Sequence, residues 1–199
     1  VMAKILDDLG VKYDIGIDEA AFYGPKLDIQ YKNVYGKEDT LVTIQIDMLL
    51  AERFGMYYID ENGEKKLPYI IHRTSLGCYE RTLAYLIEHY AGALPTWMAP
   101  EQVRFLPVTD RAVDYCKEQA AKLTAQGYRV TVDTRSEKIG KKIRDAQMEK
   151  IPYMLVVGDR DIENETVSVR TRGGEDLGAM SRADFAARVL DDVKTKRIW

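Results

Sequence analysis

The chain has 199 residues, of which 46% are hydrophobic and 31% charged, so it can bury a sizeable core in one large or two small domains and lacks the composition of a disordered protein. Its apolar runs are far shorter than the roughly 18 residues of a membrane helix, and no basic stretch with an apolar core opens it, which predicts a soluble, unsecreted protein. Two cysteines, Cys78 and Cys116, are too few for a disulfide framework, so we expect reduced thiols and a cytoplasmic location.

The net charge of −3 is unevenly distributed along the chain. Residues 1–101 hold 10 basic and 16 acidic side chains, whereas residues 102–199 hold 19 and 16. Two modules with different partners would show this asymmetry, because phosphate binding favours clustered Lys and Arg. Chance variation in surface charge is the alternative.

The first part of the chain predicts a helix and then strands. Residues 1–14 are typical of the end of an amphipathic helix stopped by Gly10, followed by a strand. No helix start signal or initiating methionine comes first, which indicates a piece of a longer protein. Residues 26–32 and 41–48 alternate polar and apolar, which predicts an antiparallel hairpin with a turn at 35–39. Its polar positions Thr43, Gln45 and Asp47 either face solvent or form the floor of a pocket.

The next part predicts a strand that runs into a helix. A short helical turn and a hairpin around 60–63 come first, since Asn-Gly suits a tight turn. Pro68 to Ile71 suits a buried strand, Gly77 allows a turn, and residues 79–90 have helical spacing. We therefore expect His72 and Arg81 to point toward one cleft. Two prolines then place a domain boundary between about residues 98 and 103.

The remainder predicts a second domain of alternating strands and helices. Strands are expected at 103–108, 128–132, 153–157 and 166–171. Three helices are expected. The first begins at an Asp110 cap, the second spans 138–150 with Ile139, Ile143 and Met148 buried, and the third begins at a Ser181 cap. The order βαβαββα predicts a mixed sheet with helices on its faces.

Several motifs carry a family resemblance. Pro68 to Arg81, which ends in Gly-x-x-Glu-Arg, resembles the third signature motif of class II aminoacyl-tRNA synthetases. The spacing from Phe22-Tyr23-Gly24-Pro25-Lys26 through Thr43–Asp47 to Ile71-His72-Arg73 resembles the threonyl-tRNA synthetases of class IIa, and the similarity covers nearly the entire chain. The resemblance implies that residues 1–101 are the C-terminal part of an antiparallel catalytic domain and that residues 102–199 form an anticodon-binding domain.

The resemblance also implies an activity. A full-length enzyme would activate threonine with ATP and Mg²⁺ and transfer it to tRNA-Thr as a cytoplasmic homodimer, whereas this piece alone would be inactive because the first two class II motifs lie upstream. One rival is a non-catalytic, synthetase-like RNA-binding protein. The other is a class IIa synthetase specific for proline, glycine or histidine.

Site residues follow from the resemblance by position. Arg81 and Thr40 would contact ATP, Lys26 would lie near the reacting groups with Arg81, and His72 would bind Zn²⁺ together with ligands upstream of this chain. The amino-acid pocket would include Tyr23, Thr43, Gln45, Asp47 and Cys78. The anticodon contacts would be Ser136, Arg144, Lys150, Asp161 and Arg170.

Four of these positions depart from the residues common in relatives, and some have simpler interpretations. Thr40-Leu41-Val42 stands in place of a glutamine-x-glycine, Cys78 replaces a serine, Ser136 an asparagine and Lys150 an arginine. Without the family context, the simpler interpretation is that Arg81 forms an ion pair on a helix surface and that His72 is a hydrogen-bonded core residue.

Overall fold

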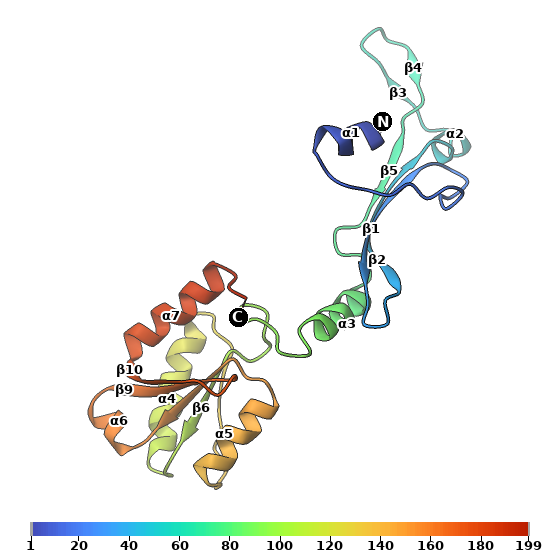
Figure 1. Cartoon of the computed structure of the whole chain (residues 1–199). Coiled ribbons are helices and arrows are strands. Elements are labelled where there is room, and N and C mark those ends of the chain that lie inside the picture. Colours follow the sequence, from blue (N-terminus) through green and yellow to red (C-terminus); the bar gives the residue numbers. More distant parts are fainter. Residues whose placement is uncertain (1, 199) are drawn as a thin grey trace. The chain divides into compact units, whose positions relative to one another are not determined.

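The structure is a computed structural model that describes residues 2–198. The chain divides into two compact units between Glu88 and His89, and each is described by itself (Figure 1). Within the described residues, no helix has both the length and the apolar character needed to cross a membrane.

The first unit contains a three-stranded antiparallel sheet with the strand order β1-β2-β5. Its elements are α1 (Met2–Asp8), β1 (Lys26–Lys32), β2 (Glu38–Asp47), α2 (Leu50–Arg53), β3 (Tyr58–Ile59), β4 (Lys65–Lys66), β5 (Ile70–Arg73) and α3 (Tyr79–His89). Both predicted hairpins and the strand before α3 are confirmed, but the burial predicted for that strand is wrong, because three of its four residues are exposed. The strand predicted after Gly10 is wrong, because residues 11–14 have no regular structure.

The most deeply buried residues of this sheet lie on its polar face, as expected for the floor of a pocket and not for a face turned to solvent. Gln45 and Asp47 are 9% and 0% exposed, whereas the apolar Ile29 and Ile71 are 53% and 66% exposed. The polar side chains are buried because Tyr23 and His72 lie against them. This face of the sheet is therefore not simply solvated.

A bulge in β2 changes which residues share the polar face. Ile29 pairs with Val42 and Gln30 pairs with Thr40, so Leu41 is an extra residue without a partner in β1. Directly opposite residues share a face, and the pairs Lys26/Gln45 and Asp28/Thr43 define the polar one. Gln30 alternates with Asp28 in β1, so its partner Thr40 lies on this polar face as well.

The second unit is a five-stranded mixed sheet with the order β10-β9-β8-β6-β7. Its elements are β6 (Val103–Pro107), α4 (Ala112–Ala125), β7 (Val130–Val132), α5 (Ile139–Met148), β8 (Tyr153–Val157), α6 (Asp159–Glu163), β9 (Thr166–Thr171), β10 (Asp176–Ser181) and α7 (Arg182–Lys194). Strands β7, β6 and β8 are parallel, and β8, β9 and β10 are antiparallel. The predicted mixed sheet is confirmed, with α6 and β10 as additions.

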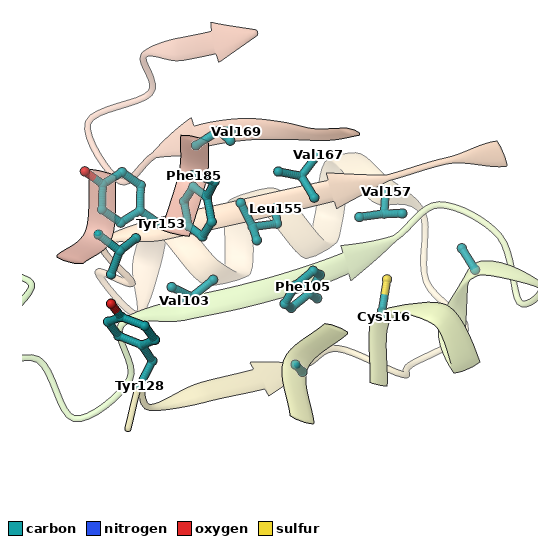
Figure 2. Packing of buried hydrophobic residues seen from close by; sticks show 13 residues of the cluster. Val103, Phe105, Cys116, Tyr128, Tyr153, Leu155, Val157, Val167, Val169 and Phe185 are labelled. Atoms are coloured by element: carbon teal, nitrogen blue, oxygen red, sulfur yellow. The ribbon is translucent and has the colours of Figure 1, made fainter. Parts of the chain in front are cut away.

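Helices cover both faces of this sheet. On one face, Phe105 and Leu155 pack with Cys116 of α4 and Phe185 of α7 (Figure 2). On the other face, Leu106 and Met154 pack with Ala146 of α5. The Ser181 cap of α7 is confirmed, since its hydroxyl accepts a hydrogen bond from the amide of Asp184.

Two details of the helix predictions are wrong. Met148 is 75% exposed, and Lys142 is buried instead, where its ammonium donates to the carbonyls of Pro107 and Asp133 at 3.1 Å. The cap of α4 is Arg111 rather than Asp110, and no side chain bonds the helix end there.

The proline-containing segment before β6 packs into the second unit. Gln102 Nε2 donates to the carbonyl of Thr96, and Arg129 donates to the carbonyls of Ala99 and Trp97. Thr96 is completely buried. The division of the chain into compact units therefore falls before this segment, earlier than the boundary expected from the prolines.

Candidate functional site

A connected polar cluster lies at one end of the first sheet. The Tyr23 hydroxyl donates to Gln45 Oε1 at 2.9 Å, and Gln45 lies opposite His72 of β5. His72 Nε2 lies 2.9 Å from Asp47 Oδ2, and the rings of Tyr23 and His72 meet edge to face with centroids 6.0 Å apart. The structure thus brings together three of the predicted pocket residues, Tyr23, Gln45 and Asp47, with the predicted zinc ligand His72.

A glycine allows this cluster to form. Gly24 has φ +152°, and a Cβ there would lie 2.0 Å from the carbonyl oxygen of Ile46. Only glycine tolerates so close an approach of the backbone to β2. Because the chain passes there, the carbonyl of Tyr23 accepts from the amide of Met48 at 2.9 Å, which holds Tyr23 beside the sheet.

Asp47 is held as a carboxylate by its surroundings. Burial alone would raise its pKa, but hydrogen bonds from His72 and from the amides of Leu50 and Leu49 outweigh that effect and lower the pKa below its usual value. The amides of Leu50 and Leu49, which lie 2.9 and 3.0 Å from Asp47 Oδ1, are at the start of α2. Asp47 therefore orients His72 and fixes the turn after β2.

A second polar group continues the same face. Asp28 accepts from Lys26 Nζ at 2.6 Å and from Thr43 Oγ1 at 2.7 Å. Although burial raises the pKa of Asp28, these two bonds lower it overall, and the carboxylate in turn raises the pKa of Lys26. Lys26 lies opposite Gln45, so this group adjoins the first cluster. Sequence reasoning missed Asp28, although its place between Lys26 and Gln30 in the alternation was the signal.

Arg81 lies beside the other end of β2. Residues 74–81 run along this strand, with the amide of Thr74 bonded to the carbonyl of Thr43 at 3.1 Å and Arg81 NH1 bonded to the carbonyl of Thr40 at 3.2 Å. Between them Gly77 has φ +64°, and a Cβ there would lie 2.2 Å from the carbonyl oxygen of Leu41. The glycine therefore allows the approach that positions Arg81.

His72 and Arg81 mark the two ends of one polar row rather than a single point. His72 lies opposite Gln45, and Arg81 bonds at Thr40, five positions away on β2. At about 3.3 Å per residue, the two positions are on the order of 15 Å apart. Cys78 is separate from both clusters, because its thiol is exposed and lies 3.0 Å from Glu80 Oε2.

The predicted zinc ligand does not form a metal site with its present neighbours. Among residues 2–198, no group of three or more His, Cys, Asp and Glu side chains is placed to hold a metal ion. Zinc takes three or four protein ligands, so His72 and Asp47 do not suffice.

In the second unit, two predicted anticodon residues lie on the α5 side of β9. Asp161 Oδ1 accepts from the hydroxyl of Ser168 at 3.1 Å, and Arg170 donates to Asp176 at 2.6 Å. Ser168 and Arg170 alternate with the buried Val167 and Val169, and Arg170 lies opposite Met154, whose side chain packs toward α5. Asp161 and Arg170 therefore share one face of the sheet.

The other three predicted residues come from α5 and its ends. Arg144 is exposed. Gln147 Nε2 lies 3.6 Å from the position that a Cβ on Gly174 would occupy, in the β9–β10 turn. Because residues three apart share one side of a helix, Arg144 is on the side of α5 that faces this turn. Ser136 is exposed in the loop before α5. Lys150 donates to the carbonyl of Ala91 and so joins the segment before β6.

Comparison with known proteins defines the class. Residues 1–90 match the tRNA synthetase class II core domain (G, H, P, S and T), and residues 102–192 match the anticodon binding domain. The antiparallel sheet with its polar row and the mixed sheet thus form part of a class II aminoacyl-tRNA synthetase core and an anticodon-binding domain.

The particular family follows from the relatives. The chain is 59% identical over 98% of its length to a threonine–tRNA ligase of Clostridium perfringens strain 13 and 46% identical over 99% to that of Staphylococcus aureus strain Newman, covering 30% and 31% of those proteins. A solved structure, the RNA binding domain of threonyl-tRNA synthetase from Cryptosporidium parvum Iowa II, is 31% identical with a TM-score of 0.85, over 96% of this chain and 48% of that one. The chain belongs to the threonine–tRNA ligase family. It spans about 30% of the length of these curated relatives.

Proposed function

We propose that this chain is part of a cytoplasmic threonine–tRNA ligase, in which residues 1–101 form one wall of the site that activates threonine with ATP. The observation that carries this proposal is the continuous polar face of β2, which has a hydrogen-bonded cluster at Gln45, the proposed pocket end, and an arginine at Thr40. An amino acid and a nucleotide joined end to end need a row of this kind. The activity belongs to the full-length protein.

The pocket end supplies groups that recognise a small polar amino acid. Tyr23 fixes the Gln45 amide, whose remaining donors and acceptor can meet the substrate. The ionised Asp47 and Thr43 extend the same polar surface, and Cys78 would approach from the segment before α3. These contacts favour a ligand with its own hydrogen-bonding side chain, because buried polar groups discriminate strongly against an analogue that cannot pair with them.

The arginine end supplies positive charge for ATP. Arg81 uses one nitrogen on the Thr40 carbonyl, and a guanidinium has five N–H donors, so donors remain for phosphate oxygens or for stacking on the base. Lys26 lies opposite Gln45, and its ammonium bonds Asp28, the next residue of the polar row toward the arginine end, where charge would develop during activation. Mg²⁺ would accompany the ATP phosphates.

A zinc ion would need donors from outside this chain. His72 is one suitable donor, and we propose it as a ligand only together with side chains supplied by the rest of a full-length enzyme. By resemblance we also propose that the full-length enzyme is a homodimer.

We further propose that residues 102–199 bind the anticodon loop of tRNA-Thr. Arg144 makes no hydrogen bond or ion pair within the described residues and is available to RNA, while Asp161 and Arg170 offer an acceptor and donors on the same sheet face. Such groups read the edges of unstacked loop bases. By resemblance, Ser136 and Lys150 would also contact anticodon bases.

Binding of tRNA-Thr to the whole chain tests the anticodon proposal. Arg170→Gln should lower affinity by about 10-fold or more, whereas the control Lys117→Gln, which removes a positive charge from α4 on the other face of the sheet, should change it little. Anticodon substitutions should weaken binding to the wild-type chain. Equal binding to every loop sequence would contradict the proposal and leave only nonspecific electrostatics.

Amino-acid specificity is tested in a full-length enzyme that carries this chain's sequence. ATP–pyrophosphate exchange should depend on threonine and should fall with Arg81→Gln. Exchange with proline and none with threonine would overturn the assignment.

A further inference from the structure

A cavity of about 310 Å³ lies within the second unit, on the sheet face covered by α4 and α7. Its floor is apolar and consists of Phe105, Leu155, Val167 and Phe185, each at most 2% exposed. The volume is about twice the ~150 Å³ of a cavity that admits benzene and lies at the lower end of small-molecule sites. A ligand of one or two rings is therefore the right size.

One wall of the cavity carries a side-chain amide without a protein partner among residues 2–198. Gln119 of α4 lines the cavity and is 7% exposed, and its side chain makes no hydrogen bond to any residue between 2 and 198. The contrast is Gln102, 2% exposed, which donates to the Thr96 carbonyl and accepts from the Arg129 amide. The amide of Gln119 therefore keeps its donors and its acceptor for a group bound in the cavity.

The charged residues that line the cavity are both cations. Lys122 of α4 pairs with Glu118 at 2.6 Å, and Arg182 of α7 pairs with Glu165 at 3.1 Å. The two glutamates do not line the cavity, and their side chains are 62% and 75% exposed. Such exposed pairs are weak, so Lys122 and Arg182 keep donors for an anion.

We propose that this cavity binds a small monocarboxylate with an aromatic or aliphatic body. The apolar body packs on the floor, the carboxylate lies between Arg182 and Lys122, and the Gln119 amide hydrogen-bonds the ligand. The site is independent of the proposed tRNA contacts, because Arg144 and Arg170 lie on the α5 face of the sheet, and the cavity lies on the α4 and α7 face.

The test uses the ¹⁵N-labelled whole chain and NMR titration with 2-naphthoate. Amide shifts should concentrate around residues 119–126 and 182–186, and 2-naphthylmethylammonium, which has a similar body and the opposite charge, should bind at least 10-fold more weakly. Equal affinity for the two probes, or shifts centred elsewhere, would overturn the proposal.

Variants separate the apolar and charged parts of the site. Ala186→Phe fills the cavity and should weaken 2-naphthoate binding at least 10-fold, whereas Ala187→Phe, on the exposed side of the same helix, should leave it unchanged. Arg182→Gln alters a side chain at the cavity edge and should weaken 2-naphthoate about 10-fold while leaving neutral 2-naphthamide unaffected. A folded Arg182→Gln variant that binds 2-naphthoate as tightly as the wild type would refute the carboxylate site.

Discussion

Replacing Gly77 with alanine tests whether the close approach of residues 74–81 to β2 positions Arg81. The new Cβ would stand 2.2 Å from the carbonyl oxygen of Leu41, and non-bonded contacts need about 3.5 Å, so the two backbones must separate by roughly 1 Å. The left-handed φ of +64° costs alanine about 1–2 kcal/mol, and the forced separation adds about 1–3 kcal/mol. We expect a destabilisation of the first unit of about 2–5 kcal/mol.

Gly63→Ala is the matched control for this prediction. Gly63 has a similar φ of +79°, but nothing lies within 4 Å of its Cβ position, so only the conformational cost of about 1–2 kcal/mol applies. Native-state hydrogen exchange at the amide of Thr74, which bonds the Thr43 carbonyl, reports the stability of the contact in each variant. In the full-length enzyme, Gly77→Ala should also raise the KM for ATP, since Arg81 would leave Thr40. Equal protection and equal KM in the two variants would refute the reasoning.

Two further predictions concern buried charges of the second unit. Tyr153→Phe removes the hydroxyl that donates to the fully buried Asp192 at 2.7 Å, and should destabilise the unit by about 1.5–3 kcal/mol in thermal unfolding, against a small effect for Tyr128→Phe. Burial, and then the bond to Asp192, raise the pKa of Tyr153 to about 12, so this stabilisation is complete below pH 10 and should be lost as the pH rises from 10 toward 12. The hydrogen bonds from Arg135 lower the pKa of Asp133, and their effect is larger than the opposing effect of burial. The wild type should therefore be more stable than Asp133→Asn at any pH above the ordinary carboxyl pKa, and this advantage should vanish as the pH falls through the lowered pKa of Asp133. A difference in unfolding free energy that persists in acid would contradict this prediction.

The fold of the second unit was largely predictable because its local signals agree with its packing. The strands Val103–Pro107 and Tyr153–Val157 are almost completely buried, as their mainly apolar sequences indicated. The strand Asp176–Ser181 was missed because its sequence, Asp-Leu-Gly-Ala-Met-Ser, lacks β-branched residues and includes a glycine at φ +75°. It forms because β9 provides a partner edge.

Burial was harder to predict than secondary structure. Helical spacing placed Met148 in the core, whereas the structure exposes Met148 and buries Lys142. A lysine becomes buried when backbone carbonyls receive its ammonium, as those of Pro107 and Asp133 do here, and such carbonyls cannot be located from side-chain patterns. The same limit applies to Gln45 and Asp47, whose partners are distant in sequence.

The bulge at Leu41 is what makes the row of site residues continuous. Strict alternation puts Thr40 on the face opposite Thr43 and Gln45, so a regular strand would direct the arginine end and the pocket end to different sides of the sheet. The extra residue reverses the alternation once, and it also presents the Leu41 carbonyl to the segment that carries Arg81, so closely that only a glycine fits at position 77. One insertion in a strand therefore aligns the face and sets the approach of α3. No periodicity in the sequence shows this, because a bulge is a property of the pairing between two strands.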